Sequence, residues 1–234
     1  MRFTRLEICE VRIPFRFSFR HALAERAEAH NLILALHADT GQVGYGEVLP
    51  RSYLTGETIA TAWADVETRW WPKLRELRLE PGADLFQALA PLYRAADADR
   101  RTAAYAGVDV AVVDACCRAW DRPVWKQLGG AGAGAAAALT APLGGSGSVS
   151  WKARTLRWLG FRQFKLKVGV GSEAEDLARI RAARDILGSG RELRVDANGA
   201  WSVEQAIRMA RQIRELGVTS VEQPVAHGPE ELAR

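Results

Sequence analysis

The last third of the chain alternates strictly between strand and helix patterns, and this alternation constrains the fold more than any other feature. The runs are strand-like at 161–168, helical at 173–187, strand-like at 192–196, helical at 203–216 and strand-like at 219–222. Each strand-plus-helix unit takes about 25 to 30 residues, which is typical of parallel βα repeats. The short run 136–143 is then predicted to be one more strand and not part of a flexible linker. The pattern predicts a parallel α/β sheet.

The first half of the chain has a different pattern, which predicts an antiparallel sheet followed by helices. Strand-like runs lie at 2–15, 31–38 and 42–49, and Asp39-Thr40-Gly41 predicts the turn between the last two. Helical periodicity follows at 58–77, 83–95 and 102–120. The last of these helices is apolar almost all round, so we expect it to be buried. An α+β domain therefore precedes the α/β domain.

Composition and charge exclude several classes of protein. With 234 residues, 48% of them hydrophobic and 26% charged, the chain has an ordinary globular composition. The net charge is +4, but the arginines are interleaved with acidic residues, so we expect no nucleic-acid partner. No apolar run approaches the roughly 20 residues of a membrane span, and charges interrupt any signal-like start. The expected location is cytoplasmic, with no membrane partner.

Two of the few lysines stand almost side by side. The chain has 32 basic residues, of which five are lysines, and Lys165 and Lys167 lie in one strand run. Residues two apart on a strand share a face, so both amines should point to the same side. Like charges held together in an interior lower each other's pKa, which favours a neutral amine that can accept a proton. A solvated lysine on a strand is the alternative interpretation.

Acidic residues end the next two strand runs. Asp196 lies 29 residues after Lys167, and Glu222 lies 26 residues after Asp196, so the charged positions recur once per βα unit. The carboxyl ends of parallel strands in a barrel meet at one mouth, where such enzymes hold their active sites. Two carboxylates there suit Mg²⁺. A single acid at a strand end is more often a turn or helix-cap residue, but the recurrence over three units favours a site.

These motifs resemble the enolase superfamily. Lys165-x-Lys167, Asp196-x-Asn198 and Glu222-Gln-Pro look like the muconate lactonizing branch, which also holds dipeptide epimerases and o-succinylbenzoate synthases. Gly44-Tyr45-Gly46-Glu47 and Thr55-Gly56-Glu57 look like its capping domain. The resemblance implies a capping domain at 1–128 and a TIM-type barrel domain from 129 to 234.

The resemblance also implies a mechanism. Lys167, tuned by Lys165, would remove the α-proton of a small carboxylate substrate, and Mg²⁺ held by Asp196 and Glu222 would stabilise the enediolate, with Mn²⁺ as a substitute. A lysine base with Mg²⁺ is a general description of this superfamily. The implied activity is that of an isomerase, either an epimerase or racemase or a cycloisomerase, or that of a lyase by β-elimination.

Further residues are expected around the substrate. Asn198 would support the metal or substrate, Thr140 would lie at the first barrel strand, and two capping-domain loops, at 15–27 and 50–56, would close over the site. These loops contribute His21 and Tyr53 as candidate substrate contacts. Gly169-Val170-Gly171 lacks the third glycine of a dinucleotide fingerprint, so no other cofactor is expected.

The family's barrel needs more strands than this chain supplies. Its metal site takes a third carboxylate from the next strand and a further lysine from the strand after that. We count strands 1 to 4 of eight up to Arg234, and expect an open half-barrel with exposed strand edges and apolar inner faces. The expectation is a C-terminally truncated chain, with a homo-oligomer or a complementary half-chain as the expected partner. The alternative function is a catalytically inert half that acts as an interaction subunit or is a degenerate product.

Overall fold

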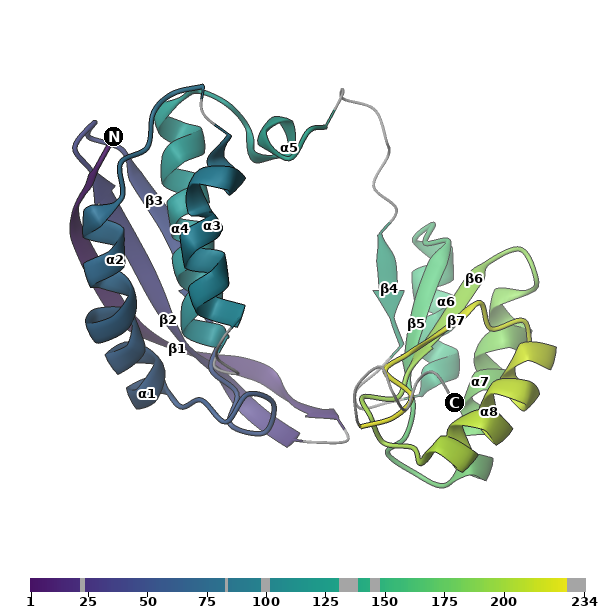
Figure 1. The fold of residues 1–234 in the computed structure, drawn as a ribbon. Coiled ribbons are helices and arrows are strands. Elements are labelled where there is room, and N and C mark those ends of the chain that lie inside the picture. Colours follow the sequence, from purple (N-terminus) through teal and green to yellow (C-terminus); the bar gives the residue numbers. More distant parts are fainter. Residues whose placement is uncertain (22–23, 83, 98–101, 131–138, 144–147, 227–234) are drawn as a thin grey trace. The chain divides into compact units, whose positions relative to one another are not determined.

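The computed structural model divides the chain into two compact units, each described here by itself (Figure 1). The first comprises Met1–Arg16 and Ala27–Gly134, and the second Phe17–Arg26 and Ala135–Arg234. The structure describes residues 1–234 except 22–23, 83, 98–101, 131–138, 144–147 and 227–234. The predicted domain boundary between 128 and 129 lies beside one of these gaps, and the predicted strand at 136–143 lies partly inside it, so the boundary stays a prediction.

The first unit is built on a three-stranded sheet. Its strands are β1 (Phe3–His21), β2 (Ala24–Ala38) and β3 (Val43–Val48), in the order β1-β2-β3. Strands β2 and β3 are antiparallel, and the predicted turn between them is present, with Gly41 at a φ of 84°. The prediction of a loop at 15–27 is wrong, because β1 runs on to His21. Phe15, Phe17 and Phe19 alternate with polar residues, which is a strand pattern.

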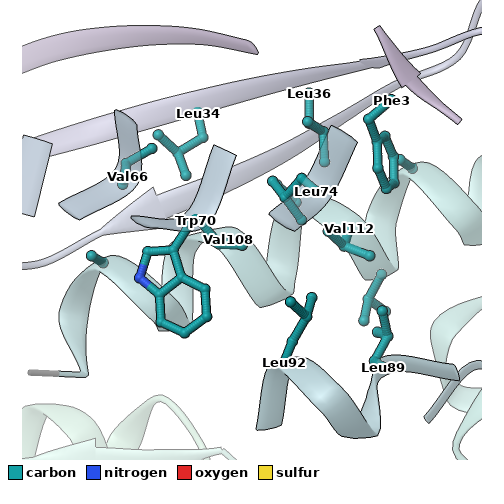
Figure 2. Close-up of a cluster of buried hydrophobic side chains, with 14 of the residues drawn as sticks. Phe3, Leu34, Leu36, Val66, Trp70, Leu74, Leu89, Leu92, Val108 and Val112 are labelled. Carbon is teal, nitrogen blue, oxygen red and sulfur yellow. The ribbon is translucent and has the colours of Figure 1, made fainter. Parts of the chain in front are cut away.

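Helices cover one face of this sheet. They are α1 (Ile59–Asp65), the π-helical η1 (Val66–Trp70), α2 (Trp71–Glu76), α3 (Leu85–Asp97), α4 (Ala103–Ala119) and α5 (Val124–Gln127). The predicted helix at 58–77 is thus one continuous run with a π-helical middle. Figure 2 shows Leu34 and Leu36 of β2 facing Trp70, Leu74 and Val112, all of them buried. These apolar side chains form the core of the first unit.

Glycines allow helix α4 to touch strand β3. A Cβ added at Gly46 would lie 1.9 Å from the carbonyl oxygen of Gly107, and one at Gly44 would lie 2.1 Å from that of Ala111. Neither distance leaves room for a side chain. The glycines of the Gly44-Tyr45-Gly46 motif therefore have a structural function, which is to let backbone pack directly on backbone.

The second unit is a parallel α/β sheet. Its strands are β4 (Thr140–Pro142), β5 (Gln163–Lys167), β6 (Glu192–Asp196) and β7 (Ser220–Glu222), in sequential order, and its helices are α6 (Val149–Trp158), α7 (Glu173–Leu187) and α8 (Val203–Glu215). The predicted alternation is confirmed. Helix α6 was not predicted from the sequence, because it follows a Gly/Ser-rich segment. Ser148 caps this helix by accepting a hydrogen bond from the Trp151 amide.

The two faces of this sheet differ in chemistry. Phe164, Leu166, Leu193 and Val195 are buried in a cluster that includes apolar residues of α7 and α8. Their neighbours along the strands, which include Lys165 and Lys167, alternate with them and so lie on the opposite face. The expectation of an apolar inner face is therefore wrong, since this face is polar and charged.

Within the described ranges, no helix combines the length and the apolar content that crossing a bilayer requires.

Candidate active site

Register brings the predicted charged residues into one row. Lys167 of β5 stands opposite Asp196 of β6, and Asp196 stands opposite Glu222 of β7. All three end their strands. Neighbouring strands lie about 4.8 Å apart, so consecutive side chains in the row can touch. The prediction that the three strand ends meet is confirmed.

Lys165 links both carboxylates. Its Nζ donates to Glu222 Oε2 at 3.1 Å and lies 3.6 Å from Asp196 Oδ2. The Asp196 side chain is only 3% exposed, whereas that of Glu222 is 58% exposed. The row therefore runs from a buried carboxylate to one that solvent and small molecules can reach.

Lys167 contacts the other side of Asp196. Its Nζ lies 3.5 Å from Asp196 Oδ2 and donates to Asn198 Oδ1 at 2.6 Å. Asn198 takes the left-handed backbone conformation, with a φ of 48°, and its own amide donates to Asp196 Oδ1 at 3.1 Å. Asp196-Ala197-Asn198-Gly199 is thus a turn, as the alternative interpretation held, and the turn also aims Asn198 at the lysine.

The pKa of Lys165 does not follow the expectation of mutual lowering. The hydrogen bond from Lys165 to Glu222 raises this pKa above its ordinary value, and the negative charges of Glu222 and Asp196 act in the same direction. Burial lowers it, but burial is outweighed. With the carboxylates free to pair with it, Lys165 is held as an ammonium ion.

The donor set fits a hard divalent cation. Asp196 and Glu222 offer carboxylate oxygens from adjacent strands, which is the ligand chemistry of Mg²⁺. Asn198 Oδ1 lies 2.6 Å from Lys167 Nζ, which itself lies 3.5 Å from Asp196 Oδ2. Lys165, held as an ammonium ion, already pairs with both carboxylates, so the position between them accommodates a positive charge. Among the described residues, no group of three or more His, Cys, Asp or Glu is arranged to hold a metal ion.

The other predicted site residues are not brought to this row by any described contact. Thr140 begins β4 opposite Gln163, and its Oγ1 donates to Gln163 Oε1 at 3.3 Å. The residue of β4 that stands opposite Lys165 is Pro142. Tyr53 belongs to the first unit, and the His21 side chain lies outside the described residues. Substrate contacts by these three residues stay predictions.

Sequence reasoning missed one buried acid beside the row. Asp176, in the first turn of α7, is 1% exposed, and its Oδ2 accepts a hydrogen bond from the Gly169 amide at 2.6 Å. An acid at this position looks like an ordinary favourable charge at a helix N-terminus. The signal that distinguishes it is the glycine seven residues earlier, immediately after the strand.

A parallel sheet with acids and bases at the carboxyl ends of its strands is typical of α/β enzymes. Within that class, residues 149–234 match the family described as enolase C-terminal domain-like. The whole chain is 30% identical over 230 residues to the hydrophobic dipeptide epimerase of Enterococcus faecalis, covering 96% of this chain and 62% of that protein. The resemblance to the enolase superfamily is confirmed, and residues 149–234 match the model of its C-terminal domain.

Solved structures give the same assignment. The dipeptide epimerase from Enterococcus faecalis, complexed with Mg and the dipeptide L-Leu-L-Tyr, is 27% identical with a TM-score of 0.78 and covers 97% of this chain and 62% of its own. A muconate lactonizing enzyme from Pseudomonas fluorescens shares the fold, at 24% identity and a TM-score of 0.81, covering 96% of this chain and 60% of its own. The chain spans about three fifths of the length of the relatives it matches.

Proposed function

We propose that this chain carries the acid/base group and part of the metal site of a Mg²⁺-dependent isomerase that acts at the α-carbon of a small carboxylate substrate. The single observation that carries the proposal is the row of Lys165, Lys167, Asp196 and Glu222 on one face of three adjacent strands. Epimerisation or racemisation is the favoured reaction and dipeptides are the favoured substrates, because several of the relatives are dipeptide epimerases, among them one of 30% identity. Cycloisomerisation uses the same groups.

The roles follow from the contacts. Lys167, as the neutral amine, would take the α-proton, and Asn198 Oδ1 would hold its Nζ in place. Asp196 and Glu222 would hold Mg²⁺, with Mn²⁺ accepted by the same oxygens. When bound, the metal would stabilise negative charge on the substrate carboxylate while the α-proton leaves. Lys165, between both acids, would balance their charge.

No described contact favours the inert interaction subunit. A second copy or a complementary half-chain as partner stays a prediction. The proposed substrate class rests on the relatives, whereas the proposed base and metal ligands rest on the geometry of the second unit.

Titration of Mg²⁺ into the purified chain, followed by calorimetry, tests the metal site. We expect Asp196→Asn to weaken binding at least about tenfold, because an amide supplies no charge to the cation. The matched control is Glu192→Gln, on the same strand, whose carboxylate is paired with Arg194 at 2.6 Å. It should bind Mg²⁺ as the unaltered chain does. An unaltered chain that binds no Mg²⁺, or an Asp196→Asn variant with unchanged affinity, would contradict the proposal.

A further inference from the structure

Asp176 is a buried carboxylate with no place in the proposed chemistry. It is 1% exposed, and its two oxygens accept from the Gly169 amide at 2.6 Å and from Arg179 Nη1 at 3.2 Å. Burial raises its pKa, although both hydrogen-bond donors act to lower it. Burying a carboxylate costs free energy unless specific contacts compensate. Its contact with Gly169 is therefore the first place to look for its function.

Gly169 lies where the chain leaves strand β5, two residues after Lys167. Its φ is +80°, and a Cβ there would lie 2.5 Å from Ala200 Cβ and 3.1 Å from the Ala197 carbonyl oxygen. The Val168 amide, one residue earlier, donates to the Asp196 carbonyl oxygen at 2.9 Å. The segment after β5 thus sits directly against residues 197–200, with no space between the two backbones.

The segment 197–200 carries the partner of Lys167. Asn198 accepts from Lys167 Nζ at 2.6 Å, and the amide of the next residue, Gly199, donates to the Gln223 carbonyl oxygen at 2.7 Å. The loops that follow β5, β6 and β7 therefore rest on one another in order. Asp176 anchors the loop after β5 through Gly169. Lys167 comes just before this loop, and Asn198 lies in the loop after β6, against which it packs.

We propose that Asp176 is a positioning residue: by fixing the Gly169 amide it seats the loop after β5 against residues 197–200, and so holds Lys167 Nζ at Asn198 Oδ1. Its importance for catalysis rests on the proposed function, but the geometric effect does not. The side-chain hydrogen bonds of Asp176 go to Gly169 and Arg179, so its proposed influence on Lys167 and Asn198 passes through Gly169 and the backbone.

Nuclear magnetic resonance of the isotope-labelled full chain tests this inference without any activity assay. In Asp176→Ala, Gly169 amide exchange should become at least about tenfold faster, because its acceptor is gone. The side-chain amide resonances of Asn198 should shift, and so should the indole resonance of Trp201, whose Nε1 lies 3.8 Å from the position of a Gly169 Cβ. Asp176→Asn keeps an acceptor oxygen and should restore both resonances and most of the protection.

The matched control is Glu175→Gln. Glu175 immediately precedes Asp176 in the same first turn. Its carboxylate accepts a hydrogen bond from the Ser172 amide at 2.7 Å, whereas that of Asp176 accepts from the Gly169 amide. It should leave the Asn198 and Trp201 resonances unchanged. Faster Gly169 exchange with an unmoved Asn198 side chain in Asp176→Ala would overturn the inference, because Asp176 would then only hold the Gly169 amide.

A second variant covers the case in which Asp176→Ala does not fold. Gly169→Ala keeps Asp176 but places a methyl group where Ala200 lies, so it should shift the same Asn198 and Trp201 resonances. Unshifted resonances would overturn the proposal. The Mg²⁺ titration separates this inference from the proposed function: loss of Mg²⁺ binding on Asp196→Asn speaks only to the latter, and the Asn198 response to Asp176→Ala only to the former.

Discussion

Glu57 of the first unit and Asp196 of the second unit are both buried acids, but their hydrogen-bond partners differ. In the first unit, Glu57 is 1% exposed and its carboxylate accepts hydrogen bonds from the Ala103 and Ala104 amides, at 2.9 and 3.3 Å, at the start of α4. In the second unit, Asp196 is 2% exposed, and its Oδ2 lies 3.6 Å from Lys165 Nζ and 3.5 Å from Lys167 Nζ. Glu57 thus satisfies the first amides of α4. Asp196 belongs instead to a row of charged side chains, of which Glu222 is exposed to solvent.

The difference separates scaffold from site. A carboxylate that satisfies backbone amides cannot be released without exposing the ends of the chain's own helices. Asp196 Oδ2, which lies beside the two lysine side chains, can exchange these partners for a metal ion while Oδ1 keeps its hydrogen bond from the Asn198 amide. We therefore expect substitutions in the first unit to cost stability and those in the strand-end row to cost binding.

The largest stability effect is expected at the contact between α4 and β3. Gly46→Ala places a methyl carbon 1.9 Å from the Gly107 carbonyl oxygen, so helix and strand must separate. The expected loss is about 3 kcal/mol or more, enough to unfold a marginal unit. Circular dichroism melts measure it. Gly190→Ala, where a Cβ meets nothing within 4 Å, is the control and should melt close to the unaltered chain. Equal melting temperatures of the two variants would show that the close contact between α4 and β3 does not limit stability.

A matched pair of acid-to-amide changes tests the comparison itself. Glu57→Gln should lower the melting temperature by about 2 to 6 °C, because one amide oxygen replaces two charged acceptors of backbone N–H groups. Asp196→Asn should change it by less than about 2 °C, since its lysine partners are partly solvated. Differential scanning calorimetry of both variants decides. If Asp196→Asn proved the more destabilising, the division into scaffold and site would fail.

The smallest effect is expected at Asp109 of α4, and it depends on pH. Burial raises the pKa of Asp109, although its hydrogen bond with Tyr93 opposes this, and burial raises the pKa of Tyr93 to about 12. A carboxyl with a raised pKa contributes stability below its unfolded pKa and loses that contribution as pH rises through the folded value. Asp109→Asn should therefore raise the melting temperature slightly at pH 7, by about 1 to 3 °C.

The pH series supplies the control for this prediction. The gain from Asp109→Asn should shrink as pH falls from 7 to about 4, and should approach zero below the ordinary pKa of aspartate, because the acid is then protonated in both the folded and the unfolded state. A gain that is the same at pH 4 and pH 7 would show that charge is not its cause.

Periodicity and spacing predicted the parallel sheet and the meeting of its strand ends. Lys165 and Lys167 share a face because strands repeat every two residues, and Asp196 and Glu222 follow because βα units have similar lengths. These features depend on local pattern, which a sequence displays directly.

Contacts between distant backbones escaped prediction. Nothing local distinguishes Asp176 from an ordinary first-turn acid, and its contact with Gly169 depends on how the loop after β5 packs. The expected lowering of the Lys165 pKa is wrong for the same reason, since it rests on the neighbouring lysine and not on the hydrogen bond that Lys165 donates to Glu222. The strand to His21 was missed because a resemblance to mobile loops was given more weight than the alternation of phenylalanines.

The central claim is that Lys167 removes an α-proton with the help of Mg²⁺ at Asp196 and Glu222. The most direct measurement incubates the chain with L-dipeptides in D₂O and follows deuterium incorporation at the α-carbon by mass spectrometry and NMR, with Mg²⁺ and with chelator. We expect deuterium incorporation at the α-carbon to require Mg²⁺ and to be abolished by Lys167→Ala. Incorporation that persists in Lys167→Ala, or its absence from the unaltered chain with Mg²⁺ bound, would contradict it.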